Sequence, residues 1–255
     1  MTVADERFHR LLQEARDDPA ILGLVLTGSR GKGFGTEASD YDVLVFVRDK
    51  DLGPFRTRFG EDTPTGIDWR ATTLDEFEAY ASWGSASAWD RYSFAHAAVL
   101  VDKTGRIRRM VDEKGSVPEE HRRPIVRSAL DAYINGVYRS LKCRRNRNQL
   151  GALLEAADSV GHALTVIFAL EGRLRPYHGY LERELRAYPL NAFPLSPDDL
   201  LAALELIVRR GEAGAQQRLL GVVEVVTRAA GYGDVIDAWG SDYEWMTHVH
   251  LPELT

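Results

Sequence analysis

Two closely spaced aspartates behind a glycine-rich loop carry the plainest chemistry in this sequence. Residues 24–29 read Leu-Val-Leu-Thr-Gly-Ser, and a ten-residue spacer then leads to Asp40, Tyr41 and Asp42 and an apolar run to Val47. Aspartates at i and i+2 on a strand point to one face of a sheet. Their charges repel each other unless a cation neutralises both. Mg²⁺ suits such oxygen ligands, and substrate phosphates usually complete its coordination.

A third carboxylate comes from the next candidate strand. Ile67 and Trp69 share one face of that strand, so Asp68 lies on the opposite, open face. Asp62 and Asp75 lie nearby, and only the apolar flanks of Asp68 select it. Three converging carboxylates suit two metal ions that clamp the entering and leaving oxygens. The predicted chemistry is in-line transfer at a phosphate.

The glycine-rich loop adds a place for an anion. Four glycines lie between residues 28 and 35, and glycine lets backbone N–H groups approach an anion closely. Arg30 and Lys32 could steady phosphate charge or be solvated loop residues. The competing interpretation is a plain turn in which Asp40 and Asp42 act as turn caps, since both patterns occur by chance.

The elements that position these residues follow from the spacing of apolar side chains. Residues 4–18 show the stripe of an amphipathic helix. Four segments have the character of strands, namely residues 21–27, 43–47, 65–73 and 97–101. After about residue 115 the period becomes helical, with a capping-box pattern at Ser116-Val117-Pro118-Glu119 and another helix start at Ser196. The predicted fold class is α+β, with a mixed-sheet domain over residues 1–115 and a helical bundle over residues 116–255.

The motif resembles that of a known superfamily. Gly28-Ser29, the spacer, Asp40-x-Asp42 and the isolated Asp68 are similar to the polymerase-β-like nucleotidyltransferases. The spacer length and Ser39 directly before Asp40 look most like the antibiotic nucleotidyltransferases, such as the kanamycin and streptomycin adenylyltransferases. The motif covers about residues 21–70, and the helical half is similar to those enzymes in layout only.

The resemblance implies an enzyme and gives roles to the matching positions. Asp40 and Asp42 would bind two Mg²⁺ ions, and Asp68 would hold one of them near the attacking hydroxyl. Gly28 and Ser29 would hold the triphosphate of ATP. AMP would then pass to an acceptor hydroxyl, and pyrophosphate would leave. Arg30 and Ser39 complete the nucleotide-binding residues that we expect in this half.

A basic block in the helical half is a second candidate for the triphosphate. Between residues 121 and 148 lie eight cations, with Asp131 as the only acid: Arg122, Arg123, Arg127, Arg139, Lys142, Arg144, Arg145 and Arg147. Lys142 is our first choice, because it follows Leu141 at the end of the first helix and kanamycin-type enzymes also place a lysine of the helical half on the triphosphate. The alternative is a solvated helix end whose cations suit its C-terminus. Nucleic-acid binding is not expected, since few aromatic residues are interleaved.

The next helix carries a polar stripe. Glu155, Asp158 and His162 stand at i, i+3 and i+7. Antibiotic adenylyltransferases commonly take a glutamate base from outside the paired-aspartate strand, which makes Glu155 the leading candidate for the general base. Asp158, or Asp68 beside the metal, could serve instead. An exposed helix face without catalytic function is the alternative.

Composition limits the class of protein. The 255 residues carry 32 Lys+Arg against 38 Asp+Glu, a formal net charge of −6, with 44% hydrophobic residues. This mix is that of a globular protein. A lone Cys143 excludes a disulfide scaffold. No apolar run approaches the roughly 18 residues that span a bilayer, and the first residues lack the pattern of a signal peptide. We therefore expect a cytoplasmic protein without a membrane partner.

Three functions follow from these observations. The first is Mg²⁺-dependent transfer of AMP from ATP to a hydroxyl of a small molecule, such as an aminoglycoside-like antibiotic, with a role in antibiotic resistance. The second changes the acceptor to a protein side chain, as in the minimal nucleotidyltransferases of toxin–antitoxin pairs. The third is a non-catalytic nucleotide-binding module, against which the intact carboxylate trio argues.

Overall fold

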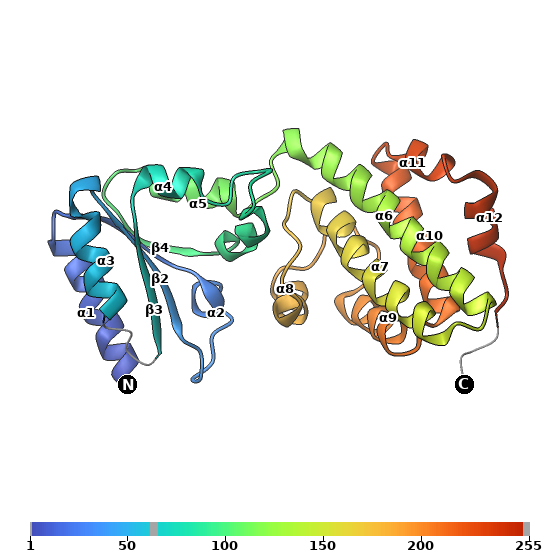
Figure 1. Ribbon diagram of the computed structural model, residues 1–255, viewed down its shortest axis with the longest axis horizontal. Coiled ribbons are helices and arrows are strands. Elements are labelled where there is room, and N and C mark those ends of the chain that lie inside the picture. Colours follow the sequence, from blue (N-terminus) through green and yellow to red (C-terminus); the bar gives the residue numbers. More distant parts are fainter. Residues whose placement is uncertain (1, 62–65, 252–255) are drawn as a thin grey trace. The chain divides into compact units, whose positions relative to one another are not determined.

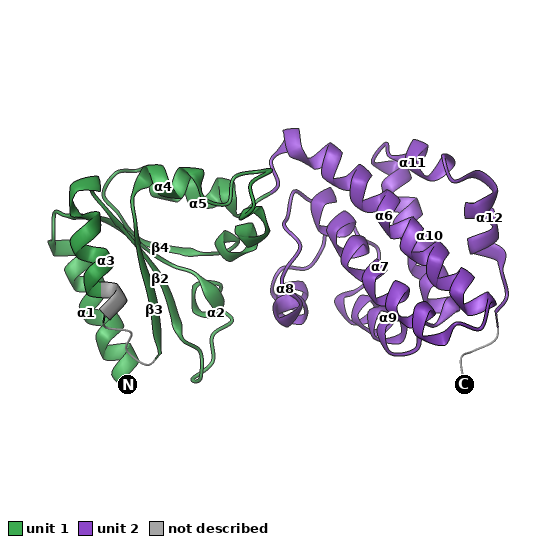
Figure 2. Ribbon diagram, in the orientation of Figure 1, with its two compact units in different colours: residues 1–116 green, residues 117–255 purple. Residues whose placement is uncertain are grey.

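The chain forms two compact units, residues 1–116 and residues 117–255 (Figure 2). The computed structural model describes residues 2–61 and 66–251. The first unit combines one sheet with helices, and the second has helices and connecting loops but no strand among its described residues. The predicted α+β fold class is therefore confirmed. The division lies one residue from the boundary expected at 115/116, and the roles expected of the two units stay predictions.

Four strands form a single mixed sheet in the first unit (Figure 1). They are β1 (Ile21–Leu26), β2 (Tyr41–Val47), β3 (Ile67–Thr72) and β4 (Ala98–Asp102), in the order β3-β2-β1-β4. β1 runs antiparallel to β2 and β4, whereas β2 and β3 are parallel. All four strands were expected, the third from the alternation of its side chains. The expected start of the third strand at Thr65 lies outside the described residues.

Helices cover both faces of this sheet. On one face α1 (Val3–Asp17) and α3 (Leu52–Glu61) pack against the strands through Phe8 and Phe55. On the other face lie α4 (Leu74–Ala79), the 3₁₀ segment η2 (Ala88–Phe94) and α5 (Ile107–Lys114). There Phe77 meets Phe46 and Phe94 edge-on, at centroid distances of 4.9 and 5.1 Å. Because side chains alternate along β2, Asp42 shares the second face with Leu44 and Phe46.

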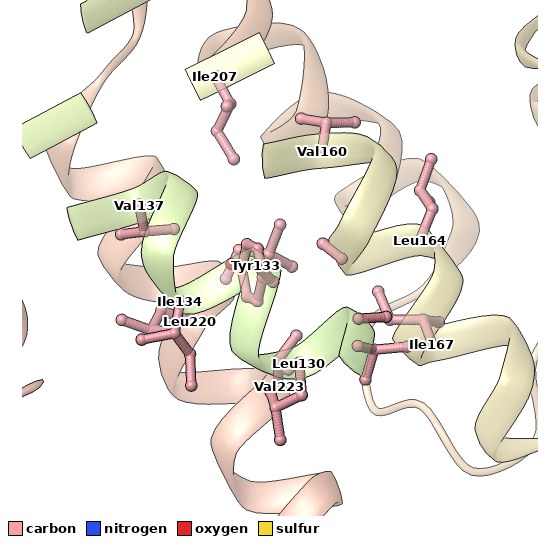
Figure 3. Packing of buried hydrophobic residues seen from close by; sticks show 14 of the residues in the cluster. Leu130, Tyr133, Ile134, Val137, Val160, Leu164, Ile167, Ile207, Leu220 and Val223 are labelled. Carbon is pink, nitrogen blue, oxygen red and sulfur yellow. The ribbon is translucent and has the colours of Figure 1, made fainter. Parts of the chain in front are cut away.

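A bundle of helices builds the second unit. Its longest members are α6 (Glu119–Arg145) and α7 (Gln149–Leu170), followed by η3 (His178–Tyr180), α8 (Leu181–Ala187), α9 (Pro197–Arg210), α10 (Ala213–Ala229), α11 (Gly233–Asp237) and α12 (Gly240–His248). Figure 3 shows Tyr133 of α6 at the centre of a buried apolar cluster. Side chains of α7, α9 and α10 pack in the same cluster, among them Leu164, Ile207 and Leu220.

The two expected helix starts had different outcomes. Ser196 caps α9 as predicted, because its Oγ accepts a hydrogen bond from the backbone N of Asp199 at 3.1 Å. The prediction of a capping box at Ser116 is wrong. α6 begins after Pro118 without a side-chain cap, and the Ser116 hydroxyl donates to the carbonyl oxygen of Asp112 at 3.0 Å. The residue that was expected to begin α6 thus closes α5 instead.

Helix α7 qualifies the expectation about membranes. It is the one described helix that is long and apolar enough to cross a bilayer, with a mean hydropathy of 1.4 over its best 18-residue window. Half of that window is buried inside the protein. The buried side of α7 includes Ala156, Leu164 and Ile167, all within the core cluster of the second unit. Core helices pass the same test of length and composition, so the finding is weak evidence for a membrane span.

Candidate active site

The first feature of the site is a contact between Gly28 and Asp42. Gly28 begins the short helix α2 (Gly28–Gly31) with a φ of +57°. A Cβ at this position would lie 1.7 Å from Oδ2 of Asp42. The backbone N of Thr27 donates to the carbonyl oxygen of Asp42 at 2.8 Å, which fixes the loop against the start of β2. Glycine is therefore required at position 28 both by its backbone angle and by the carboxylate beside it.

Asp42 and Asp68 form a pair across two strands. They are register partners in the parallel pairing of β2 with β3, and both line a cavity of about 280 Å³. Burial raises the pKa of the half-buried Asp42 above its usual range, and the charges of Asp68 and Asp40 raise it further. Within the described residues neither the Asp42 nor the Asp68 carboxylate accepts a hydrogen bond. This is the setting in which a cation would relieve the repulsion of two carboxylates.

Asp40 does not join this pair in one cavity. It is exposed, precedes the first residue of β2, and lines a neighbouring pocket of about 440 Å³ with Arg30 and Ser39. Strand alternation sets the direction of Asp42 but does not extend to Asp40, because β2 begins at Tyr41. Across residues 2–61 and 66–251, no three His, Cys, Asp or Glu side chains come together as a metal-holding group. The expected three-carboxylate cluster is thus divided between two pockets, and its metal-binding role stays a prediction.

Three of the expected nucleotide-binding residues shape the loop. The Arg30 Nε donates to the carbonyl oxygen of Ser39 at 2.8 Å, and its guanidinium lies 4.2 Å from the centre of the Tyr41 ring. The Ser39 hydroxyl accepts from the backbone N of Thr36 at 2.9 Å. Neither Arg30 nor Ser39 lines the cavity of Asp42. Ser29 is partly exposed on α2, next to the glycine that touches Asp42.

Lys32 has a different function from the two weighed for it. Its side chain is buried, with 3% exposure. The ammonium donates to the carbonyl oxygens of Tyr92 and Ser93, at 2.7 and 3.2 Å, and also to that of Ala95. Lys32 is therefore neither a phosphate ligand nor a solvated loop residue. It ties the glycine-rich loop to the end of η2, beside the cavity.

Three residues that line this cavity, and Tyr80, which hydrogen-bonds to one of them, were not predicted as site residues from the sequence. Arg70 follows Asp68 by two residues on the same face of β3, and Asp90 and Ser93 come from η2. Tyr80 donates its hydroxyl to Oδ2 of Asp90 at 2.7 Å, and Ser93 donates to the other oxygen. The rule of alternation that selected Asp68 could have selected Arg70 as well. The other three depend on the 3₁₀ segment, for which the sequence has no periodic signal.

The residues expected from the helical half lie in the second unit, where Glu155 and Lys142 contact neighbouring side chains. Glu155 pairs with Arg139 of α6 at 2.5 Å, so its carboxylate is engaged within the bundle. Asp158 and His162 are exposed on α7. Lys142 is exposed, with its Nζ 5.4 Å from the centre of the Tyr138 ring. The base and triphosphate roles stay predictions.

The basic block does not form one patch. Arg127 pairs with Asp234 of α11, and Arg145 lies over the ring of Trp245 on α12. Arg144 is buried and donates to the carbonyl oxygen of Gly211 at 3.0 Å, which closes the end of α9. Because α6 turns every 3.6 residues, cations that are close in sequence point in different directions around it.

Comparison with known proteins finds a family match within the first unit. Residues 9–90 match the model of the nucleotidyltransferase domain family. The matched residues include Gly28, the Asp42–Asp68 pair and the start of η2, so the resemblance to polymerase-β-like nucleotidyltransferases is supported over this part of the chain. The antibiotic-type assignment receives no support from this match.

The wider comparisons are less specific. No curated protein matches the chain in sequence. Among solved structures the chain is similar to a nucleotidyltransferase-like protein from Exiguobacterium sibiricum 255-15. The two are 12% identical, with a TM-score of 0.43, and the similarity covers 91% of this chain and 77% of that chain.

Proposed function

We propose that this protein is a Mg²⁺-dependent adenylyltransferase that moves AMP from ATP to a hydroxyl group of a small molecule, with an aminoglycoside-like antibiotic as the first acceptor to test. The observation that carries the proposal is the in-register Asp42–Asp68 pair in a cavity beside Gly28. It lies inside the residues that match the nucleotidyltransferase domain.

The residues present fit a divalent cation. Asp42 and Asp68 offer carboxylate oxygens, the ligand type that Mg²⁺ prefers. Burial raises the pKa of Asp42, and the nearby charges of Asp68 and Asp40 raise it further, which a bound cation would counter. Asp42 and Asp68 would hold a first ion, and Asp40 would contribute to a second. When bound, Mg²⁺ supplies positive charge to the triphosphate and to the attacking hydroxyl.

The remaining groups have roles in binding and proton transfer. The backbone at Gly28 and Ser29 borders Asp42 and would orient the phosphates. The acceptor oxygen attacks the α-phosphorus, the bond from this phosphorus to the bridging oxygen breaks, and pyrophosphate leaves. The hydroxyl proton passes to a carboxylate. We favour Asp68 as this base, since it shares the cavity, over Glu155 and Asp158 of the second unit.

A pyrophosphate-release screen tests the proposal. The protein is incubated with ATP, Mg²⁺ and a panel of aminoglycosides, lincosamides and other hydroxylated metabolites, with parallel wells that contain GTP, CTP or UTP. We expect pyrophosphate release with at least one acceptor, lost on chelation by EDTA, and a product heavier by one AMP. Release with another nucleotide would correct the base preference. Labelling of a protein band from a lysate would favour the protein-acceptor function, and no release with any acceptor would contradict the enzyme.

A further inference from the structure

A basic side chain that is not part of the sequence motif lines the cavity of Asp42 and Asp68. Among the described residues that line this cavity, Arg70 is the one with a positively charged side chain. It lies two residues beyond Asp68 on β3, so alternation directs both side chains to the same face. The other cations expected near the triphosphate from this unit lie elsewhere, since Arg30 stacks on Tyr41 and Lys32 is buried against carbonyl oxygens. Arg70 is exposed and stands at the cavity.

Tyr80 and Asp90 hold Arg70 in place. The Arg70 guanidinium lies 4.7 Å from the centre of the Tyr80 ring, a stacking distance at which cation and ring attract. Burial raises the pKa of Tyr80, and Asp90 adds to the rise while Arg70 opposes it. The Tyr80 hydroxyl therefore stays protonated and donates to Asp90 at 2.7 Å. Asp90 thus holds the Tyr80 hydroxyl, and the Tyr80 ring contacts the guanidinium.

We propose that Arg70 is a further substrate-binding residue that contacts the triphosphate of the nucleotide in the Asp42–Asp68 cavity, with Tyr80 as its positioning residue. This inference rests on the proposed nucleotidyl transfer. A guanidinium presents donors in a planar fork that fits two phosphate oxygens at once. Phosphoryl-transfer sites need such cations because charge accumulates on the phosphate oxygens and the leaving pyrophosphate.

Binding of inorganic tripolyphosphate, measured by calorimetry with Mg²⁺, tests the inference without any assumption about the base or the acceptor. Arg70→Gln should lower the affinity for tripolyphosphate and for ATP by about 10-fold to 100-fold, the range for a hydrogen-bonded charged pair. The affinity for AMP should change by less than about threefold. The affinity of Arg70→Lys should lie between those of Arg70→Gln and the wild type, because lysine keeps the positive charge but lacks the planar, two-pronged donor group of arginine. Arg56→Gln, which removes an exposed arginine paired with Glu76 outside the cavity, is the control and should bind as the wild type does.

The outcomes separate this inference from the function on which it rests. If Arg70→Gln binds tripolyphosphate as tightly as the wild type while Asp42→Asn abolishes transfer, the role of Arg70 is wrong and the enzyme stands. If the wild-type protein binds neither tripolyphosphate nor any nucleoside triphosphate, the proposed function itself fails. Circular dichroism of each variant establishes that the fold is retained, as expected for an exposed side chain.

The positioning role of Tyr80 has its own readout. Tyr80→Phe removes the hydroxyl that donates to Asp90 but keeps the ring beside the guanidinium, so tripolyphosphate affinity should stay within about threefold of the wild type. Tyr80→Leu removes the ring and should lower the affinity by more than Tyr80→Phe does. Equal affinity of the two variants, with both folded, would show that stacking does not position Arg70.

Discussion

At the residue scale, the site depends on how closely the glycine-rich loop approaches Asp42. The Asp42 carboxylate occupies the space that a side chain at position 28 would need, since a Cβ there would lie 1.7 Å from Oδ2. In the sequence the motif has two parts, the glycine-rich loop and the paired aspartates. Here the two parts are in direct contact, so a change in the loop acts on the acid.

Alanine at Gly28 should therefore damage the site, and alanine at Gly33 should not. Both glycines have positive φ, +57° and +74°, so both substitutions incur the left-handed penalty of about 1–2 kcal/mol. Only Gly28→Ala also displaces Asp42, because a Cβ at Gly33 meets no atom within 4 Å. We expect Gly28→Ala to lose both transfer activity and more unfolding free energy than Gly33→Ala, as measured by pyrophosphate release and by urea denaturation. Equal behaviour of the two variants would contradict the contact.

The charge of Asp42 should oppose folding in the absence of metal. Its pKa is raised in the folded state, chiefly by burial, so the folded protein binds the Asp42 proton more tightly than the unfolded chain does. The unfolding free energy contributed by this group then falls as pH rises from the ordinary aspartate pKa through the raised one. Asp42→Asn should raise the melting temperature at pH 7 in EDTA, with a smaller gain at pH 4. A lower melting temperature at pH 7 would contradict this sign.

At the element scale, the segment η2 forms one wall of the cavity. Residues that are distant from η2 in the sequence hold it there. Lys32 holds the carbonyl oxygens at the end of η2, and the buried Arg91 donates to the carbonyl oxygen of Ala81 at 2.9 Å. Apolar runs and, for the third strand, the alternation of side chains predicted all four strands, because a strand carries this signal locally. No such signal predicts η2, since long-range polar contacts fix it, and for this reason Asp90 and Ser93 were missed.

Replacing Lys32 should destabilise the first unit. Lys32→Met removes the buried ammonium from the carbonyl oxygens of Tyr92, Ser93 and Ala95 and leaves them without this donor. The expected loss of unfolding free energy is about 2–4 kcal/mol. The control is Lys103→Met, whose exposed ammonium donates to one carbonyl oxygen, that of Asp18, and whose loss should be within about 0.5 kcal/mol. If urea denaturation gives the same loss for both variants, the buried contacts of Lys32 do not hold η2.

At the scale of the whole molecule, each unit has its own core. The buried cluster around Tyr133 lies entirely in the second unit, and the two clusters on the faces of the sheet lie entirely in the first. The sequence located this division because the period of apolar residues changes near residue 115. It could not show where the eight cations of residues 122–147 point, because a count of charges has no direction around a helix.

The second unit should fold alone. A fragment of residues 117–255 should show a helical circular dichroism spectrum and a cooperative urea transition, because its core needs no residue of the first unit. In such a fragment the other helices of the second unit would cover the apolar side of α7 in aqueous solution. A fragment that unfolds without a cooperative transition, or that stays in solution only with detergent, would contradict this prediction.

The most direct test of the central claim is the transfer of label from α-³²P-ATP to an acceptor found in the screen, by the wild type, Asp42→Asn and the control Asp49→Asn. Asp49 lies in the 3₁₀ segment η1 (Asp49–Asp51), outside the cavity of Asp42 and Asp68. We predict Mg²⁺-dependent transfer by the wild type and Asp49→Asn, and a loss of more than about 100-fold in Asp42→Asn. Full transfer by folded Asp42→Asn would contradict the assignment of Asp42 as the centre of nucleotidyl transfer.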